Sequence, residues 1–178
     1  CERRNVAAES VVEQLEAELL DRTASTENPA ELPIPELAHY IVKTHHGFLP
    51  RELPRLHAMA ARVAQVHGGH TPSLLAVYEV FAELEGEMVS HMKKQEEILF
   101  PTVVAMSRNE VFPVPLDEPI ACMIHEHESS GQALARLREL THGFEPPLYA
   151  CNTYRALFAG LADLEEDLHR HIHLENAV

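Results

Sequence analysis

The stretch His171-Ile172-His173-Leu174-Glu175 determines how the whole sequence is interpreted. Its first and last residues are four positions apart, so on an α-helix the imidazole of His171 and the carboxylate of Glu175 project from the same face. An imidazole and a carboxylate at this spacing are typical of one half of a metal site in a helical bundle. The sequence therefore predicts a metal site whose other ligands come from other helices.

The rest of the chain contains further segments with the apolar periodicity of long helices. The predicted long helices cover residues 35–66, 72–106, 120–141 and 152–176. Turns with glycine or proline separate them, and Pro50 and Pro54 predict a local kink in the first. Long helices joined by short turns pack antiparallel. We therefore predict an all-α fold, an antiparallel four-helix bundle preceded by a short helical segment near the N-terminus.

Each long helix carries a histidine at a matching height. His46 and His91 lie 22 and 20 residues from the turn that joins their helices, so at about 1.5 Å per residue both sit roughly 30 Å above that turn. His127 and His171 lie 16 and 19 residues from the second turn, which places them roughly 24 to 29 Å above it. Four buried imidazoles at one level, with Glu175 beside them, would lack partners unless a metal bound them.

Neighbouring histidines leave the register open in two places. His45 and His46 are adjacent and about 100° apart on a helix, so we expect only one of them to face inward, and periodicity does not choose between them. His125 and His127 cannot both point inward either, and the apolar stripe of their helix favours His127. His169 and His173 both flank His171, and we expect them at the surface.

Composition excludes several classes of partner. The formal net charge is −14, which argues against nucleic acid or an anionic membrane surface as the main partner. No apolar run is long enough to span a bilayer, so we expect no membrane insertion. The three cysteines lack CxxC spacing, which is typical of reduced thiols and favours a cytoplasmic location.

Motifs along most of the chain extend this interpretation. They are Thr44-His45-His46 with Arg51 to Pro54, Ser90 to Lys94 with Ile98 to Pro101, Glu126-His127-Glu128, and Asp167 to Asn176. With these motifs the sequence resembles the hemerythrin-like RIC (repair of iron centres) proteins. The resemblance implies a hemerythrin-like bundle over residues 36–178, a linker at 25–35 and, at 1–24, the remnant of a small N-terminal domain.

The resemblance also implies a cofactor and its ligands. The family has a non-haem di-iron centre (Fe2+/Fe3+), with an oxo or hydroxo bridge between the irons. Its first-helix ligand lies seven residues before the leucine that matches Leu53, which selects His46 over His45. The remaining matches to ligand positions are His91, His127, His171 and Glu175. Glu87 and Glu126 match acidic residues that line an access route, although a solvated helix face explains these two carboxylates equally well.

One position departs from the family pattern. Where the second helix of the family carries a bridging glutamate, four residues after the histidine, this sequence has Gln95. An amide oxygen coordinates weakly and brings no negative charge. Gln95 is therefore a weak ligand, or a water or hydroxide fills the gap, or the second iron is held less tightly.

By resemblance, the leading hypothesis is repair of iron–sulfur clusters damaged by nitrosative or oxidative stress, through iron donation or through NO binding and reduction. The partners would be damaged iron–sulfur proteins and the small molecules NO or O2. An O2 or NO carrier or sensor without turnover is the alternative, and a ferritin-like oxidase or peroxidase is the third hypothesis. The sequence is compatible with a homodimer and does not fix the oligomeric state.

Overall fold

A computed structural model of the chain describes residues 28–110 and 115–178. The predicted domain remnant at 1–24 and the short helical segment within it lie outside the described residues. The first described element is a 3-10 turn, η1 (Pro29–Glu31). The chain divides after Leu32, and the features below belong to the unit Pro33–Val178.

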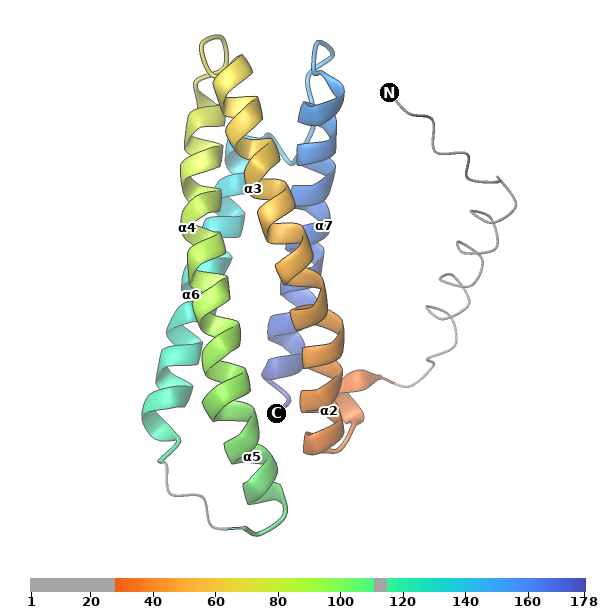
Figure 1. Ribbon diagram of the computed structural model, residues 1–178, viewed down its shortest axis with the longest axis vertical. Coiled ribbons are helices and arrows are strands. Elements are labelled where there is room, and N and C mark those ends of the chain that lie inside the picture. Colours follow the sequence, from red (N-terminus) through yellow and green to blue (C-terminus); the bar gives the residue numbers. More distant parts are fainter. Residues whose placement is uncertain (1–27, 111–114) are drawn as a thin grey trace, which may run out of the picture. The chain divides into compact units, whose positions relative to one another are not determined.

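Four helical rods form this unit, as far as the described residues show (Figure 1). The first rod consists of α2 (Ile34–Ile41), the π-helical turn η2 (Val42–His46) and α3 (Gly47–His67). The second consists of α4 (Ser73–Lys94), a second π-helical turn η3 (Gln95–Leu99) and α5 (Phe100–Ser107). The third and fourth rods are α6 (Asp117–Leu140) and α7 (Asn152–Glu175). α3 packs against both α4 and α7, α4 packs against α6, and α2 packs against α5 and α7.

The two π-helical turns are the main local difference from the predicted helices. Both precede a proline, namely Pro50 within α3 and Pro101 in the first turn of α5. A proline has no N–H for the carbonyl four residues before it, whereas a π-helix bonds each carbonyl to the N–H five residues on. An irregular turn of the first rod therefore lies at 42–46, before Pro50, whereas α3 continues as an α-helix through Pro50 and Pro54, where a kink was predicted.

The interior of the bundle is apolar toward the turn between α3 and α4. Leu56, Phe81 and Leu157 are fully buried there on three different helices. Gly160 on α7 allows the close approach of α3, because an added Cβ would lie 2.5 Å from Leu56 Cδ2. Among the described helices, none has both the length and the apolar character needed to cross a membrane.

Candidate metal centre

The structure brings the predicted ligands together at the other end of the bundle. His46 comes from η2, His91 from α4, His127 from α6, and His171 and Glu175 from α7. They form two clusters, His46–His171–Glu175 and His91–His127–Glu175, and within each cluster the possible ligand atoms lie within 4.8 Å of one another. Glu175 belongs to both clusters. A carboxylate shared by two pairs of imidazoles is a geometry suited to two neighbouring cations.

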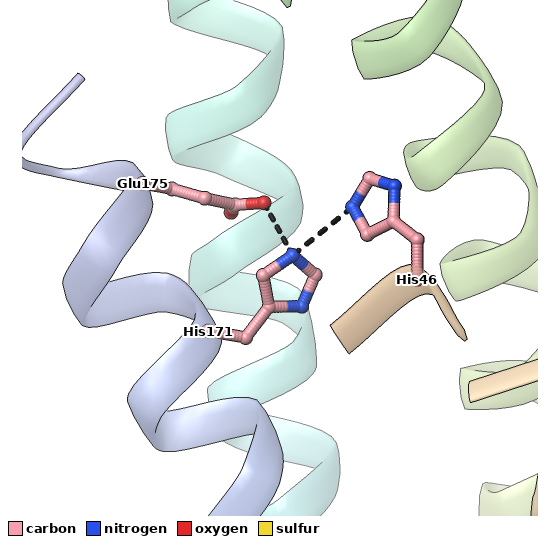
Figure 2. Close-up of side chains that lie close together, drawn as sticks. All are labelled: His46, His171 and Glu175. Carbon is pink, nitrogen blue, oxygen red and sulfur yellow. Dashed lines mark hydrogen bonds and ion pairs between the residues drawn. The ribbon is translucent and has the colours of Figure 1, made fainter. Parts of the chain in front are cut away.

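Distances around Glu175 show how the two clusters divide its oxygens. Oε1 lies 2.6 Å from His171 Nε2, and Oε2 lies 2.7 Å from His127 Nε2 and 3.6 Å from His91 Nε2. His46 completes the first cluster, with its Nε2 atom 3.2 Å from that of His171 (Figure 2). Each carboxylate oxygen thus faces one pair of imidazoles.

Gln95 also lies at this level, as the sequence predicts. It starts the turn η3, one helical turn after His91, and its side chain is fully buried. Neither its amide nitrogen nor its amide oxygen has a hydrogen-bond partner among the described residues. The structure does not test whether Gln95 coordinates a metal, so its role stays a prediction.

The donor set fits a bound metal. Both oxygens of Glu175 and Nε2 of His127 are buried and do not meet hydrogen-bond geometry with any described group. Unpaired buried polar atoms cost free energy, and several in one place are rare in native proteins. Imidazole and carboxylate donors without thiolate suit iron, manganese or zinc. The set is therefore best explained as a site for such cations.

Two further carboxylates orient the histidines from outside the clusters. Nδ1 of His46 lies 2.8 Å from Glu96 Oε1, and Nδ1 of His91 lies 2.9 Å from Glu126 Oε2. A proton on each Nδ1 is donated to the carboxylate, so each Nε2 keeps its lone pair for a metal. Glu96 was not predicted, because its position lies off the inward stripe of its own helix. Its contact with His46 comes from the neighbouring rod.

Electrostatics keep Glu175 ionised. Burial raises the pKa of Glu175, but the nitrogens of His127, His171 and His91 outweigh burial and hold the pKa well below its usual range. Burial lowers the pKa of His91, yet Glu175 and Glu126 raise it more, so the net shift is upward. Burial and the nearby His171 lower the pKa of His46. The site therefore presents an anion between imidazoles, which suits a cation.

The expectation for the adjacent histidines was wrong in one respect. His45 and His46 are 4% and 5% exposed, so both are buried. The regular spacing of an α-helix does not apply to them, because both lie in the π-helical turn η2. Only His46 joins a cluster of possible ligands among the described residues. On α6, His125 is exposed and His127 lies in the site, and His169 and His173 are exposed as predicted.

Glu87 and Glu126 line a hollow between α4 and α6, which we call the acidic hollow. The hollow has a volume of about 590 Å³, and Glu83 and His125 also line it. Glu87 is exposed and accepts a hydrogen bond from Ser129 Oγ at 3.0 Å. Glu126 is partly buried and joins the hollow to His91.

A second cavity reaches the site from the side of α5. Its volume is about 570 Å³, and most of its lining is apolar, including Leu99, Val103 and Ile120. Gln95, His127 and Glu175 are among its polar lining residues. Small apolar molecules would find a path to the metal ligands here.

Comparison with known proteins places this geometry in a family. The family profile described as "Hemerythrin HHE cation binding domain" matches residues 37–178. The chain is 32% identical over 175 residues to "Iron-sulfur cluster repair protein ScdA" of Staphylococcus haemolyticus, covering 98% of the chain and 78% of that protein. It is 35% identical over 170 residues to "Iron-sulfur cluster repair protein YtfE" of Pectobacterium carotovorum, covering 93% of the chain and 74% of that protein. The YtfE protein of Yersinia pseudotuberculosis is 37% identical over 174 residues, covering 97% of the chain and 75% of that protein.

The chain belongs to the hemerythrin-like iron–sulfur cluster repair family. The family and the all-α four-helix fold predicted from the sequence are thereby confirmed. Within this hemerythrin-like domain, the clustered histidines and glutamate are groups able to hold a cation.

Proposed function

We propose that this protein repairs iron–sulfur clusters damaged by nitrosative or oxidative stress by means of two iron ions held between its four rods. His46 and His171 would hold one ion, His91 and His127 the other, and Glu175 both. The observation that carries the proposal is Glu175 itself. Its side chain is buried among four imidazoles, with Oε1 2.6 Å from His171 Nε2 and Oε2 2.7 Å from His127 Nε2, and neither contact has hydrogen-bond geometry. When bound, an iron pair supplies electrons and open coordination positions for NO, O2 or peroxide.

The residues around the two ions would determine how many ions bind and how tightly each ion is held. Glu96 and Glu126 would hold the rings of His46 and His91 in the orientation that a metal needs. Gln95 would offer a neutral amide oxygen at the position where the family pattern has a bridging carboxylate. With one negative charge fewer between two cations, one ion should bind less tightly, which favours release of iron to a client.

The acidic hollow supports the proposal that iron moves as cargo between this site and a client. Glu83, Glu87 and Glu126 give it an acidic lining, and a divalent cation is attracted to such a lining. Lys94 forms an ion pair with Glu126, so one carboxylate of this lining already has a cationic partner. A damaged iron–sulfur protein would receive its iron on this side.

The apolar cavity supports a second candidate function, reversible binding of NO or O2 without turnover. Diatomic molecules are weakly hydrated, and the cavity leads them toward Gln95, His127 and Glu175. Such a carrier or sensor would need the apolar cavity and would have no use for the acidic hollow. The presence of both features favours repair.

Two assays on the iron-loaded protein test the proposal. In the first, anaerobic NO is added to the reduced protein and N2O is measured. In the second, transfer of iron to a cluster protein that has lost its iron is followed. We expect two irons per chain and activity in at least one assay for the wild type, and activity in neither for Glu175→Gln. Glu166→Gln is the matched control, because Glu166 lies on the same helix with a side chain that is 63% exposed.

Two outcomes would contradict the proposal. A protein that binds iron but shows neither activity, and forms a stable NO or O2 adduct, would be a carrier or sensor. A wild type that takes up no iron would show that the buried cluster is not a metal site.

A further inference from the structure

His45 is a buried histidine that the proposed iron pair does not use. Its Nδ1 atom lies 2.8 Å from Asp167 Oδ1, so the ring is held by a carboxylate of α7. The ring also lies parallel to that of His171, with 4° between the planes and 5.0 Å between the centroids. The flat face of the His45 ring therefore packs against the flat face of a proposed ligand ring, and His45 does not point toward the metal positions.

The proposed ligands on the first two rods are supported differently from His171. Glu96 and Glu126 accept hydrogen bonds from His46 and His91 through Nδ1. Across residues 28–110 and 115–178, no side-chain hydrogen bond reaches Nδ1 of His171. Outside the proposed ligands, the flat face of His45 packs against the His171 ring. An imidazole without a hydrogen bond at its second nitrogen can turn about its side-chain torsion unless packing prevents it.

We propose that His45 and Asp167 are a positioning pair, in which the stacked ring of His45, anchored by Asp167, holds the His171 ring with Nε2 toward the metal. The inference rests on the proposed metal site and adds to it two residues that do not touch the metal. Stacking thus does for His171 what the carboxylates do for His46 and His91.

Local structure explains why consecutive histidines can serve two purposes. His45 and His46 both lie in η2, where the π-helical turn allows both side chains to be buried. His46 reaches the cluster, while His45 lies against α7. Asp167 is one helical turn before His171, so the first rod contacts α7 both through the ring of His171 and through the carboxylate that anchors His45. Tyr40 meets His45 edge to face, with 6.4 Å between ring centroids, and packs against it within the first rod.

The test measures cobalt(II) binding, because cobalt occupies similar donor sets and its visible spectrum reports ligand geometry. The wild type should bind two ions per chain. In His45→Leu, which removes the aromatic face, we expect the affinity for one ion to fall roughly tenfold to a hundredfold, as is usual when support outside the ligands is lost. Its cobalt spectrum should change as well. In His45→Phe, which keeps a flat ring, affinity and spectrum should stay close to those of the wild type.

His39→Ala and Asp163→Ala are matched controls, because they remove an exposed histidine of α2 and an exposed aspartate one turn before Asp167. Circular dichroism shows which variants fold. If His45→Leu does not fold, Asp167→Ala replaces it, since this change leaves the His45 ring in place without its anchor, and it should show the same loss.

The outcomes separate the two proposals. A folded His45→Leu, or Asp167→Ala in its place, that matches the wild type in both affinity and spectrum overturns the positioning pair. So does a His45→Phe that is as weak as His45→Leu, because the aromatic face would then not be the support. If the wild type binds no cobalt, the metal site itself is wrong and the positioning pair falls with it.

Discussion

Both ends of the bundle contain buried side chains, but these side chains are apolar at one end and polar at the other. Toward the turn between α3 and α4, fully buried Leu56, Phe81 and Leu157 are removed from water, which stabilises the fold without any ligand. At the other end His91, Gln95 and His171 are at most 1% exposed, and buried polar atoms without a hydrogen bond, such as those of the Gln95 amide, cost free energy unless something binds them. One end therefore stabilises the bundle, and the other end uses that stability to hold a site open for cations.

The ends also differ in helical regularity. The π-helical turns η2 and η3 both lie at the site end, and they carry His45, His46 and Gln95. Toward the other end α3 and α4 are regular helices. Departures from regular helix geometry at functional sites are common because they re-aim side chains. The comparison predicts that changes at one end should leave the other largely intact.

The largest expected effect comes from the shared carboxylate. Glu175→Gln removes the carboxylate that both clusters share, so the affinity for both ions should fall by roughly a hundredfold or more. This loss exceeds the roughly tenfold to hundredfold loss expected when a residue that only supports a ligand is changed. Metal analysis after gel filtration measures this. Glu166→Gln should keep two irons per chain, and two irons in Glu175→Gln would show that the ions are held elsewhere.

A change at the apolar end should act on stability alone. In Gly160→Ala the new Cβ meets Cδ2 of the fully buried Leu56 at 2.5 Å, so the Leu56 side chain or the helices must shift. Overpacking of this kind costs about 1 to 3 kcal/mol of unfolding free energy, which denaturant titration measures. Gly131→Ala, where the added Cβ has open space, is the control and should be neutral or stabilising. If Gly160→Ala lost iron while keeping its stability, the two ends would not be independent.

Gln95→Glu sharpens the comparison by adding charge at the site end. A second carboxylate between two cations should tighten the weaker ion by about tenfold, while the metal-free protein becomes less stable, because another buried anion lies beside Glu175. Competition with a chelator measures the first effect and thermal denaturation of metal-free protein the second. Equal iron affinities in the two proteins would show that Gln95 does not limit the site.

The smallest predicted effect is a pH dependence of the metal-free protein. The pKa of Glu175 is lowered in the fold, so its ionised form stabilises the protein above about pH 4.3, and this is lost as the pH falls through the folded pKa. The pKa of His91 is raised, so its contribution is complete below about pH 6.5 and is lost as the pH rises through the folded pKa. Glu175→Gln should therefore cost more stability at about pH 5.5 than at about pH 8. Denaturant titrations at both pH values test this, and an equal cost at both would contradict it.

Sequence periodicity was sufficient to predict the position of side chains in the parts of the molecule that form regular α-helices. Counting residues from the turns placed His46, His91, His127 and His171 at one level because the rise per residue is constant. The same regularity put Gln95 one turn after His91, facing the site.

The sequence was insufficient to predict side-chain positions where a helix is irregular, or contacts that join two different rods. His45 was expected to face away if His46 faced inward, and the π-helical turn buries both. Glu96 and Asp167 contact histidines on other rods, and no periodicity within one helix reveals such a pair. The general tendency of ligand histidines to donate to a carboxylate was the one signal that could have suggested them.

The helix α6 contributes residues to both the apolar cavity and the acidic hollow beside α4. Ile120, Met123 and Ile124 face the apolar cavity, whereas His125, Glu126 and Ser129 face the acidic one. A protein seated over the acidic side would leave the apolar side uncovered, so a gas molecule and an iron ion need not share one entrance. If the proposed repair function holds, delivery of iron to a client and arrival of NO would be able to occur at the same time.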